Sequence, residues 1–359
     1  MPMQHTSATE SSSRRHWMTF FAVLGFLLPI IAIALYLVHV TNEMALEDSL
    51  GPTDGGMIAA STDPFPVGVN PKGQSIAELP NVESHLEASI QRGTLTPTSS
   101  PDSASVPLFS NAILEKIIAR LTLFDWYQNL AAGGSRVLII QPGERKEQIA
   151  MNIGKVLRWS EDEKREFLAS IVSSDPILLE GKFAPGTYVV SEGAKPSDVA
   201  PLVLARFGET ILMRYPKDVS AQVPLHDALT IASLLEREAY DFEDMRYIAG
   251  VIWNRLFIDM NLQIDATLQY AKGTDAPKTW WPMPVPKDKY IESPYNTYQN
   301  SGLPPTPIAN PSPDAVLAAL NPRETDCMYY FHDKDSGFHC TETYEEHVAE
   351  LKKYYGRGR

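Results

Sequence analysis

Residues 229–240, LTIASLLEREAY, decide the interpretation of this chain, because their helical repeat carries a carboxylate inside an apolar stripe. At about 100° per residue, Ile231 and Leu235 lie on one side of a helix. Glu238 falls inside that arc, whereas Glu236 falls at its border and is expected to face solvent. A carboxylate held against apolar neighbours is costly to ionise, so its pKa rises and it can serve as a general acid near neutral pH.

A second, structural interpretation of Glu238 is also open. An ordinary helix can bury this carboxylate beside a basic partner, and Arg246 and Arg255 are the candidates that follow in the sequence. The helical pattern is expected to continue, with a break near Asp241, through MRYIAGVIWNRL. The pattern therefore singles out Glu238 without assigning its role.

An apolar segment near the N-terminus predicts a membrane anchor. Residues 17–40, WMTFFAVLGFLLPIIAIALYLVHV, contain no Asp, Glu, Lys or Arg and are long enough to cross a bilayer as a helix. Arg14 and Arg15 precede this segment, and Glu43 follows it. The positive-inside rule then places residues 1–16 in the cytoplasm and the remainder outside. We expect a single-pass protein of the inner membrane with its folded part in the periplasm or an equivalent extracytoplasmic space.

The net charge limits the classes of binding partner, and the two cysteines raise the question of a disulfide. The net charge of −13 argues against nucleic acid, because an acidic surface repels an anionic polymer. The two cysteines, Cys327 and Cys340, flank a predicted hairpin with a DKDSG turn, which would bring their sulfur atoms to nearly opposed positions. A cross-strand disulfide and a pair of free thiols both remain open.

The segment after the predicted anchor differs in composition from the rest. Residues 41–104 are rich in Pro, Ser, Thr and Gly and hold few large apolar side chains. Such a composition buries too little apolar surface to offset the entropy of ordering, so a disordered tether is predicted. Within residues 105–135, the stretch 110–129 has the apolar spacing of an amphipathic helix. That helix can pack on the folded part, on a membrane surface or on a partner.

Two folded units are predicted beyond the tether. Residues 136–225 predict a small β-α-α-β unit that begins with a strand and turn in RVLIIQPGE. Its second helix is expected after Ser160, where Glu163 completes a capping box. Residues 226–355 predict a second, mixed α/β unit that closes with the cysteine-flanked hairpin and a helix. The expected fold class is α+β.

Four blocks of the second unit are similar in order and spacing to one known family. They are LTIASLLEREAY (229–240), VIWNRL (251–256), LQIDATLQYAKG (262–273) and YNTYQNSGLPPTPIANPS (295–312). In these blocks, and in EGKFAPGTY of the first unit, the chain resembles the membrane-anchored endolytic murein transglycosylases of the YceG-like family. The resemblance implies that residues 136–225 form a LysM-like domain and that residues 226–355 form the catalytic domain.

The resemblance also implies a reaction. It is a lyase reaction that cuts nascent peptidoglycan between N-acetylmuramic acid and N-acetylglucosamine, which ends strand elongation, and peptidoglycan synthases are the expected protein partners. The family's essential glutamate matches the second glutamate of the S-x-x-E-x-E block, which is Glu238, with Glu236 as the alternative. One carboxyl group suffices, because the muramoyl C6 hydroxyl is the nucleophile and leaves a 1,6-anhydro end. No cofactor is expected.

The matching blocks supply further candidates. Asp265 is the candidate for stabilising oxocarbenium-like charge, and a helix-capping role is its alternative. The side chains expected to bind sugar hydroxyl and acetamido groups are Gln263, Asn254, Tyr295, Asn296, Thr297 and Tyr298. Asn254 can instead brace a loop, since it lies late in a predicted helix. Trp280 and Trp281 can stack on sugars or pack in the core.

A metal site and two other functions are the alternatives to an enzyme of this kind. His332, His339 and His347 match no compact ligand motif, and the DKDSG turn lacks the glutamate that ends an EF-hand loop, so no metal site is predicted. A catalytically inactive peptidoglycan-binding scaffold and an interaction protein of the division or elongation machinery remain as alternative functions. The presence of Glu238 within a matching block favours the enzyme.

Overall fold

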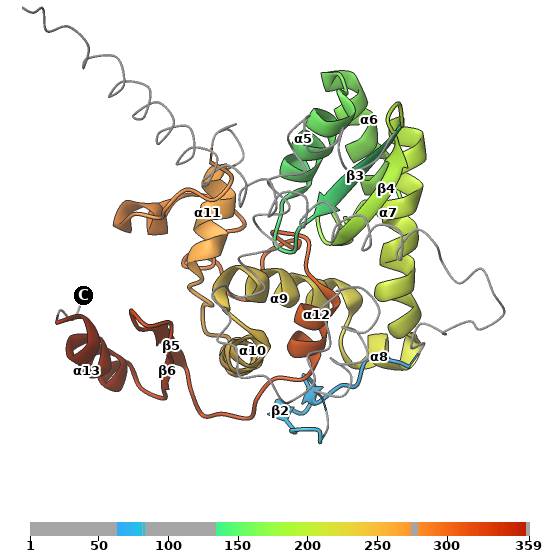
Figure 1. Ribbon diagram of the computed structural model, residues 1–359. Coiled ribbons are helices and arrows are strands. Elements are labelled where there is room, and N and C mark those ends of the chain that lie inside the picture. Colours follow the sequence, from blue (N-terminus) through green and yellow to red (C-terminus); the bar gives the residue numbers. More distant parts are fainter. Residues whose placement is uncertain (1–62, 81, 83–133, 274–278, 357–359) are drawn as a thin grey trace, which may run out of the picture.

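Helix α9 (Leu225–Glu238) lies in the larger of two hydrophobic cores (Figure 1). The computed structural model describes residues 63–80, 82, 134–273 and 279–356. Every side chain of α9 from Ala228 to Leu235 is buried. Helices α10 (Phe242–Phe257) and α12 (Pro313–Leu320) pack against it. The last turn of α9 leaves this core and carries Glu236 and Glu238.

The chain breaks between α9 and α10, as the sequence predicts. Ala239 has an extended backbone, and the side chain of Asp241 caps α10 by accepting a hydrogen bond from the Asp244 N–H at 2.8 Å. Because the helix stops at Glu238, this carboxylate projects from a helix end instead of from the middle of a packed face.

The first unit has the predicted β-α-α-β order. Strand β3 (Ser135–Ile140) pairs antiparallel with β4 (Gly186–Ser191), so that Ser135 lies opposite Ser191 and Ile140 opposite Gly186. Between them lie α5 (Lys146–Leu157) and α6 (Glu161–Val172), and the predicted capping box of Ser160 and Glu163 is present. The smaller core fills the space between these strands and helices.

One helix joins the two cores. In α7 (Pro196–Thr210), Val199 and Val203 pack in the smaller core, whereas Phe207 packs in the larger one. Ile211 and Tyr215, on either side of η1 (Leu212–Arg214), and Val219 of α8 (Lys217–Gln222) are also buried in the larger core. The first unit is therefore fixed to the second through a continuous helix.

A buried asparagine also fixes the first unit to the second. The Asn310 Oδ1 accepts hydrogen bonds from the N–H groups of Gly181 (2.7 Å) and Phe183 (3.0 Å). Its Nδ2 donates to the Glu144 carbonyl at 3.0 Å and to the Glu180 carboxylate at 2.8 Å. The GLPPTPIANP segment (302–311) thus contributes to a junction between the units, which we define by Glu144, Glu180 and Asn310.

The prediction of a disordered tether over residues 41–104 is wrong for residues 63–80 and 82. Strands β1 (Val69–Asn70) and β2 (Ser75–Ile76) form a short hairpin near α12, and Phe65 and Val82 are buried in the larger core. A segment with few apolar residues can still order when each of them inserts into a core built by other elements. The average composition of residues 41–104 does not reveal which single apolar side chains insert into the core.

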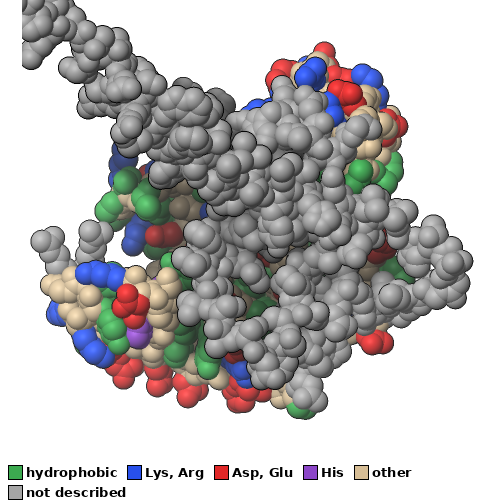
Figure 2. Space-filling model, in the orientation of Figure 1, with side chains coloured by type: hydrophobic (Ala, Val, Ile, Leu, Met, Phe, Trp, Pro, Cys, Tyr) green, Lys and Arg blue, Asp and Glu red, His purple; other side chains and the backbone are tan. Residues whose placement is uncertain are grey.

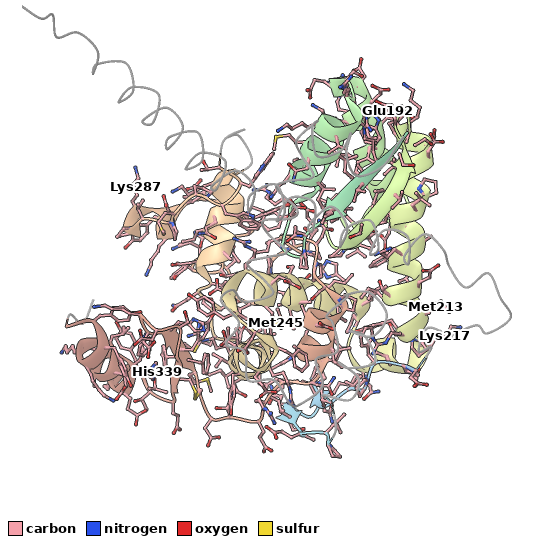
Figure 3. The ribbon with its side chains drawn as sticks, in the orientation of Figure 1. Glu192, Met213, Lys217, Met245, Lys287 and His339 are labelled. Carbon is pink, nitrogen blue, oxygen red and sulfur yellow. A yellow bond between two sulfur atoms is a disulfide. The ribbon has the colours of Figure 1, made fainter. Side chains whose placement is uncertain are left out.

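Two groups of elements flank the end of α9 (Figure 3). On one side lie α11 (Asp265–Gly273) and η2 (Pro286–Tyr290), the latter marked by Lys287. On the other side lie β5 (Tyr329–His332), β6 (Phe338–Thr341) and α13 (Tyr344–Tyr355), marked by His339. A disulfide joins Cys327 to Cys340 beside this hairpin, which decides between the two alternatives for the cysteines.

The overall class is α+β, with helices and small antiparallel sheets, as predicted. Among the described residues, no helix is both long and apolar enough to cross a membrane. The predicted anchor at 17–40, the N-terminal residues 1–16 and the predicted helix at 110–129 lie outside the described part of the chain.

Candidate active site

Glu238 is held between the two groups of elements that flank the end of α9. Its Oε1 accepts a hydrogen bond from the N–H of Ala266, in the first turn of α11, at 3.3 Å. Its Oε2 accepts a hydrogen bond from the Tyr330 hydroxyl of β5 at 3.2 Å. Both contacts are long for hydrogen bonds of this kind, so the carboxyl group is held in place without being fully coordinated.

The surroundings of Glu238 favour its protonated form. Burial raises the pKa of the Glu238 carboxyl above its ordinary value of 4.5, and the nearby charge of Asp265 raises it further. The hydrogen bonds from Ala266 and Tyr330, and the charge of Arg237, act in the opposite direction on this pKa without reversing the shift. A proton donor at neutral pH requires this balance.

The expectation that Glu236 faces solvent is wrong. Its Oε1 accepts hydrogen bonds from the N–H of Ser312, at 2.7 Å, and from the Ser312 hydroxyl. Ser312 is the N-cap of α12, so Glu236 fixes the start of that helix. Burial raises the pKa of Glu236 as well. The packing of α12 over the last turn of α9 covers a position that a single helical wheel assigns to the surface.

The two arginines weighed as partners of Glu238 have other roles. The Arg246 Nε donates to the Asn321 carbonyl at 2.9 Å. The Arg255 Nε donates to the Met328 carbonyl at 2.7 Å, and its Nη1 donates to the Leu262 carbonyl. Arg255 therefore links the residues before β5 to the residues before α11, which are the two segments that hold Glu238.

The structure brings Asp265 and Tyr298 together beside Glu238. The Tyr298 hydroxyl donates to the Asp265 Oδ1 at 2.8 Å, and Asp265 is the first residue of α11. Its charge acts on Glu238, as described above. The side chain of Gln263 is exposed on the same segment, and its backbone N–H is bonded to the Thr297 carbonyl at 3.1 Å. Asp265 and Tyr298 can therefore reach a ligand at Glu238, and Gln263 is exposed two residues before Asp265.

Three other predicted ligand-binding residues instead hold loops in place. Asn296 is fully buried, and its Nδ2 donates to the carbonyls of Lys289 and Ile291. Thr297 is buried and accepts a hydrogen bond from the Ile264 N–H at 3.0 Å. The Asn254 Nδ2 donates to the Thr325 carbonyl at 2.6 Å and to the Cys327 carbonyl, as its alternative interpretation proposed.

Two aromatic candidates are half-buried and held by contacts with neighbouring side chains. Tyr295 is half-buried, and its hydroxyl lies 2.9 Å from the Thr306 hydroxyl. Trp281 is also half-buried, and the Arg237 guanidinium lies 4.0 Å from its ring centroid. Since a cation covers one face of the indole, Trp281 has at most one face left for a sugar.

Sequence reasoning missed Tyr330. Its ring stacks on Phe338 with centroids 6.0 Å apart, and its hydroxyl contacts Glu238. Tyr330 and Glu238 are 92 positions apart in the sequence, so no local periodicity relates them. The alternation of the YYFH strand beside the hairpin turn is the one signal that could have marked Tyr330 as facing inward.

The surface dips between the side of the molecule that carries α11 and η2 and the side that carries β5, β6 and α13 (Figure 2). Glu238 is bonded to α11 and to β5, so it lies between these two sides. The arrangement can place one protonated carboxyl group beside a ligand that enters from the recess. It offers a second carboxylate, Asp265, and a phenol, Tyr298, nearby.

The hairpin histidines make carboxylate and ring contacts. His332 Nε2 lies 2.8 Å from the Asp244 carboxylate, and His339 Nε2 lies 2.7 Å from the Asp333 carboxylate. His347 packs against the ring of Tyr329. Within the described residues, no group of three or more His, Cys, Asp or Glu side chains is arranged to hold a metal ion.

Comparison with known proteins identifies the family. The model of the YceG-like family matches residues 116–353, well over half of the chain. The chain belongs to the YceG-like family. The resemblance predicted from the four sequence blocks is thereby confirmed.

Relatives with assigned names agree with this membership. The endolytic murein transglycosylase of Streptococcus pneumoniae R6 is 31% identical over 227 residues, which cover 56% of this chain and 41% of that protein. The endolytic murein transglycosylase of Bacillus subtilis 168 is 35% identical over 177 residues, which cover 49% of this chain and 48% of that protein. The chain thus spans less than half the length of these curated relatives.

A solved structure shares the fold. The crystal structure of a YceG-like protein from Listeria monocytogenes superposes with a TM-score of 0.52 at 28% sequence identity. The match covers 63% of this chain and 80% of that chain.

Proposed function

We propose that this YceG-like protein is an endolytic lytic transglycosylase that cleaves the bond between N-acetylmuramic acid and N-acetylglucosamine in nascent peptidoglycan, with Glu238 as its acid and base. The observation that carries the proposal is the carboxyl group of Glu238, buried at the end of α9, with a raised pKa and two long hydrogen bonds. Family membership and the names of the relatives support the substrate class.

The reaction needs one proton donor that becomes a proton acceptor. Glu238 protonates the glycosidic oxygen, and the bond from that oxygen to C1 of the muramoyl residue breaks as the N-acetylglucosamine hydroxyl leaves. The C6 hydroxyl of the same muramoyl residue attacks C1, and its proton passes to the Glu238 carboxylate. The product has a 1,6-anhydro end and the glutamate is protonated again. Because the nucleophile belongs to the substrate, no water has to be positioned.

The neighbours of Glu238 have roles that follow from their positions. Asp265 supplies negative charge near the developing oxocarbenium ion, and Tyr298 holds that carboxylate in place by a hydrogen bond. Tyr330 and the Ala266 N–H orient the Glu238 carboxyl and stabilise it in the step in which it is ionised. Gln263, exposed beside them, is placed to bind a sugar hydroxyl or acetamido group.

The proposal includes the setting of the enzyme. Residues 17–40 anchor the chain in the inner membrane, residues 1–16 are cytoplasmic, and the folded part works in the periplasm or an equivalent extracytoplasmic space. The β-α-α-β unit of residues 136–225 is LysM-like and guides glycan to the catalytic unit of residues 226–355. The support is the apolar 17–40 segment and the antiparallel β3–β4 pair with two intervening helices. Cleavage there ends the growth of strands made by peptidoglycan synthases.

Digestion of purified glycan strands tests the proposal. Wild-type protein and Glu236→Gln are expected to release fragments with 1,6-anhydromuramoyl ends, which mass spectrometry separates from hydrated ends by the loss of one water. Glu236→Gln is the matched control, because glutamine keeps an oxygen that can accept from Ser312. Glu238→Gln is expected to lower the rate by roughly 100- to 10,000-fold, the usual contribution of general acid–base catalysis.

Other outcomes would overturn specific parts of the proposal. Anhydro ends from all three proteins at equal rates would remove Glu238 from the mechanism. Hydrated ends would make the enzyme a hydrolase. Binding without cleavage by the wild type would favour a peptidoglycan-binding scaffold.

A further inference from the structure

Tyr240 is an exposed aromatic residue that is fixed in place next to the active site. It follows Glu238 by two residues and is 66% exposed. Its backbone N–H donates to Asp244 Oδ2 at 2.8 Å, and the same oxygen lies 2.8 Å from His332 Nε2. The His332 ring in turn lies edge-on to the Tyr240 ring, with centroids 4.8 Å apart. One buried carboxylate thus positions both the backbone of Tyr240 and the ring that supports it.

Ring contacts continue from Tyr240 to the catalytic carboxyl group. The His332 ring contacts Tyr330 and Phe338, with centroids 6.4 and 5.7 Å apart. Tyr247, which is 39% exposed, stacks on Phe338 with ring centroids 5.4 Å apart. We define the aromatic ledge as Tyr240, His332, Tyr330, Phe338 and Tyr247. It begins at the hydroxyl that bonds Glu238 and ends at two exposed phenol rings.

We propose that the aromatic ledge is a sugar-binding subsite, in which the exposed ring of Tyr240 stacks on the face of a pyranose ring of the glycan strand next to the scissile bond. This inference rests on the proposed function and adds a subsite to it. A large exposed ring that is held rigidly loses little entropy when it binds, and the flat face of a sugar presents C–H groups to it. No residue that the structure describes bonds the Tyr240 hydroxyl, which can therefore bond a sugar hydroxyl or acetamido group.

The charges near the ledge favour a neutral ligand. Asp241 follows Tyr240 in the sequence and Asp244 accepts from the Tyr240 N–H, whereas Glu243 is paired with Arg246 and Arg323. Over the whole chain, acidic side chains exceed basic ones by 13. The pyranose rings and their N-acetyl groups carry no charge and meet no repulsion at such a surface, whereas an acidic stem peptide, or the free lactyl carboxylate of a peptide-free muramoyl residue, is repelled. We therefore assign the subsite to the sugar rings of the strand.

Equilibrium binding of peptide-free glycan strands tests the assignment. Each muramoyl residue of these strands carries a free lactyl carboxylate, so all variants are compared at one ionic strength of about 0.15 M, where its repulsion is screened equally. The full chain, in detergent and carrying Glu238→Gln so that strands are not cut, is compared with and without Tyr240→Ala. Loss of the stacked ring is expected to weaken binding roughly five- to tenfold. Tyr240→Phe keeps the ring and is expected to bind within about twofold of the parent. In the active protein, Tyr240→Ala is expected to raise KM with kcat nearly unchanged.

A matched control separates the ledge from exposed tyrosines in general. Tyr344 is 53% exposed and packs against Tyr329 and His347, outside the ledge. Tyr344→Ala is expected to leave strand binding unchanged. Equal binding by Tyr240→Ala and its parent, equal losses in both alanine variants, or no binding by the parent would overturn the subsite. These results are distinct from failure of the proposed function, which would appear as absence of anhydro ends from wild-type protein.

Discussion

The junction between the two units and the end of α9 both bury glutamates, but they coordinate them differently. At the junction, Glu144 accepts hydrogen bonds from the Gln141 N–H at 3.0 Å, from Gln148 at 2.9 Å and from Asn152 at 2.8 Å. Burial nevertheless raises the pKa of Glu144 to about 7. Three of the about four acceptor positions of this carboxyl group are therefore occupied by the protein.

Glu238 is half-buried with a raised pKa, but from the described part of the chain it accepts only the two long bonds from Ala266 and Tyr330. Spare bonding capacity next to a surface recess allows a ligand to bond there. A buried carboxyl group with a raised pKa is thus not sufficient to identify an acid catalyst. We propose that the coordination of such a group decides whether it supports the fold or reacts.

The largest expected effect is a loss of folding stability when the junction between the two units is disrupted. Asn310→Ala removes four hydrogen bonds and leaves the N–H groups of Gly181 and Phe183 without their acceptor. We expect the free energy of unfolding to fall by about 4 kcal/mol, since each buried group left unsatisfied costs about 1–3 kcal/mol. Denaturant unfolding measures it.

Asn300→Ala provides the control for this change. Asn300 is exposed, although its Nδ2 donates to two carbonyls, so we expect a loss of about 1 kcal/mol or less. Similar losses in the two variants would mean that Asn310 does not hold the units together.

The next effect concerns the pH dependence of stability. The folded-state pKa of Glu144, about 7, lies above its ordinary value of 4.5. Its contribution to stability is therefore fully present below pH 4.5 and is lost as the pH rises through about 7. This group alone is expected to cost the wild type about 3 kcal/mol of unfolding free energy between pH 4.5 and pH 8. Glu144→Gln should lack that part of the decline.

Glu163 supplies a control of opposite sign. Hydrogen bonds from the Ser160 backbone N–H and from Lys195 lower the pKa of Glu163 to about 2. The contribution of Glu163 to stability is therefore lost only as the pH falls below about 4.5 toward 2. Glu163→Gln is expected to keep the full decline of the wild type between pH 4.5 and pH 8. An equally steep decline in Glu144→Gln would show that Glu144 is ionised at little cost.

The smallest expected effect tests the incomplete coordination of Glu238. Tyr330→Phe removes one of its two hydrogen bonds, and that bond favours the ionised form. The pKa of Glu238 should rise, so the loss of activity on the alkaline side should move up by about one pH unit. Tyr329→Phe is the matched control, because this neighbour packs on Tyr344 and His347. A shift in both variants, or in neither, would contradict a direct action of Tyr330 on Glu238.

Local patterns in the sequence predicted much of the fold. The apolar repeat predicted α9 and its break before Asp241, and the capping box predicted the start of α6. The same repeat placed Glu238 among buried neighbours. These features depend on residues within a few positions of one another, which is the range over which periodicity and capping operate.

Contacts between distant segments could not be predicted in this way. Glu236 is covered because Ser312, 76 positions later, begins α12 above it. Tyr330 reaches Glu238 across 92 positions, and Asn310 joins Gly181 across 129. Burial of Phe65 depends on a core that the rest of the chain builds. Each of these requires the relative placement of elements, which one sequence does not provide.

The most direct measurement is the titration of the Glu238 carboxyl group itself. In protein labelled with carbon-13 at the glutamate side-chain carboxyl, the Glu238 signal is the one absent from Glu238→Gln, and its chemical shift is followed with pH. Burial at the end of α9 predicts a midpoint clearly above 4.5, with the group still largely protonated where exposed glutamates are ionised. A midpoint at or below 4.5 would contradict the assignment of Glu238 as the proton donor.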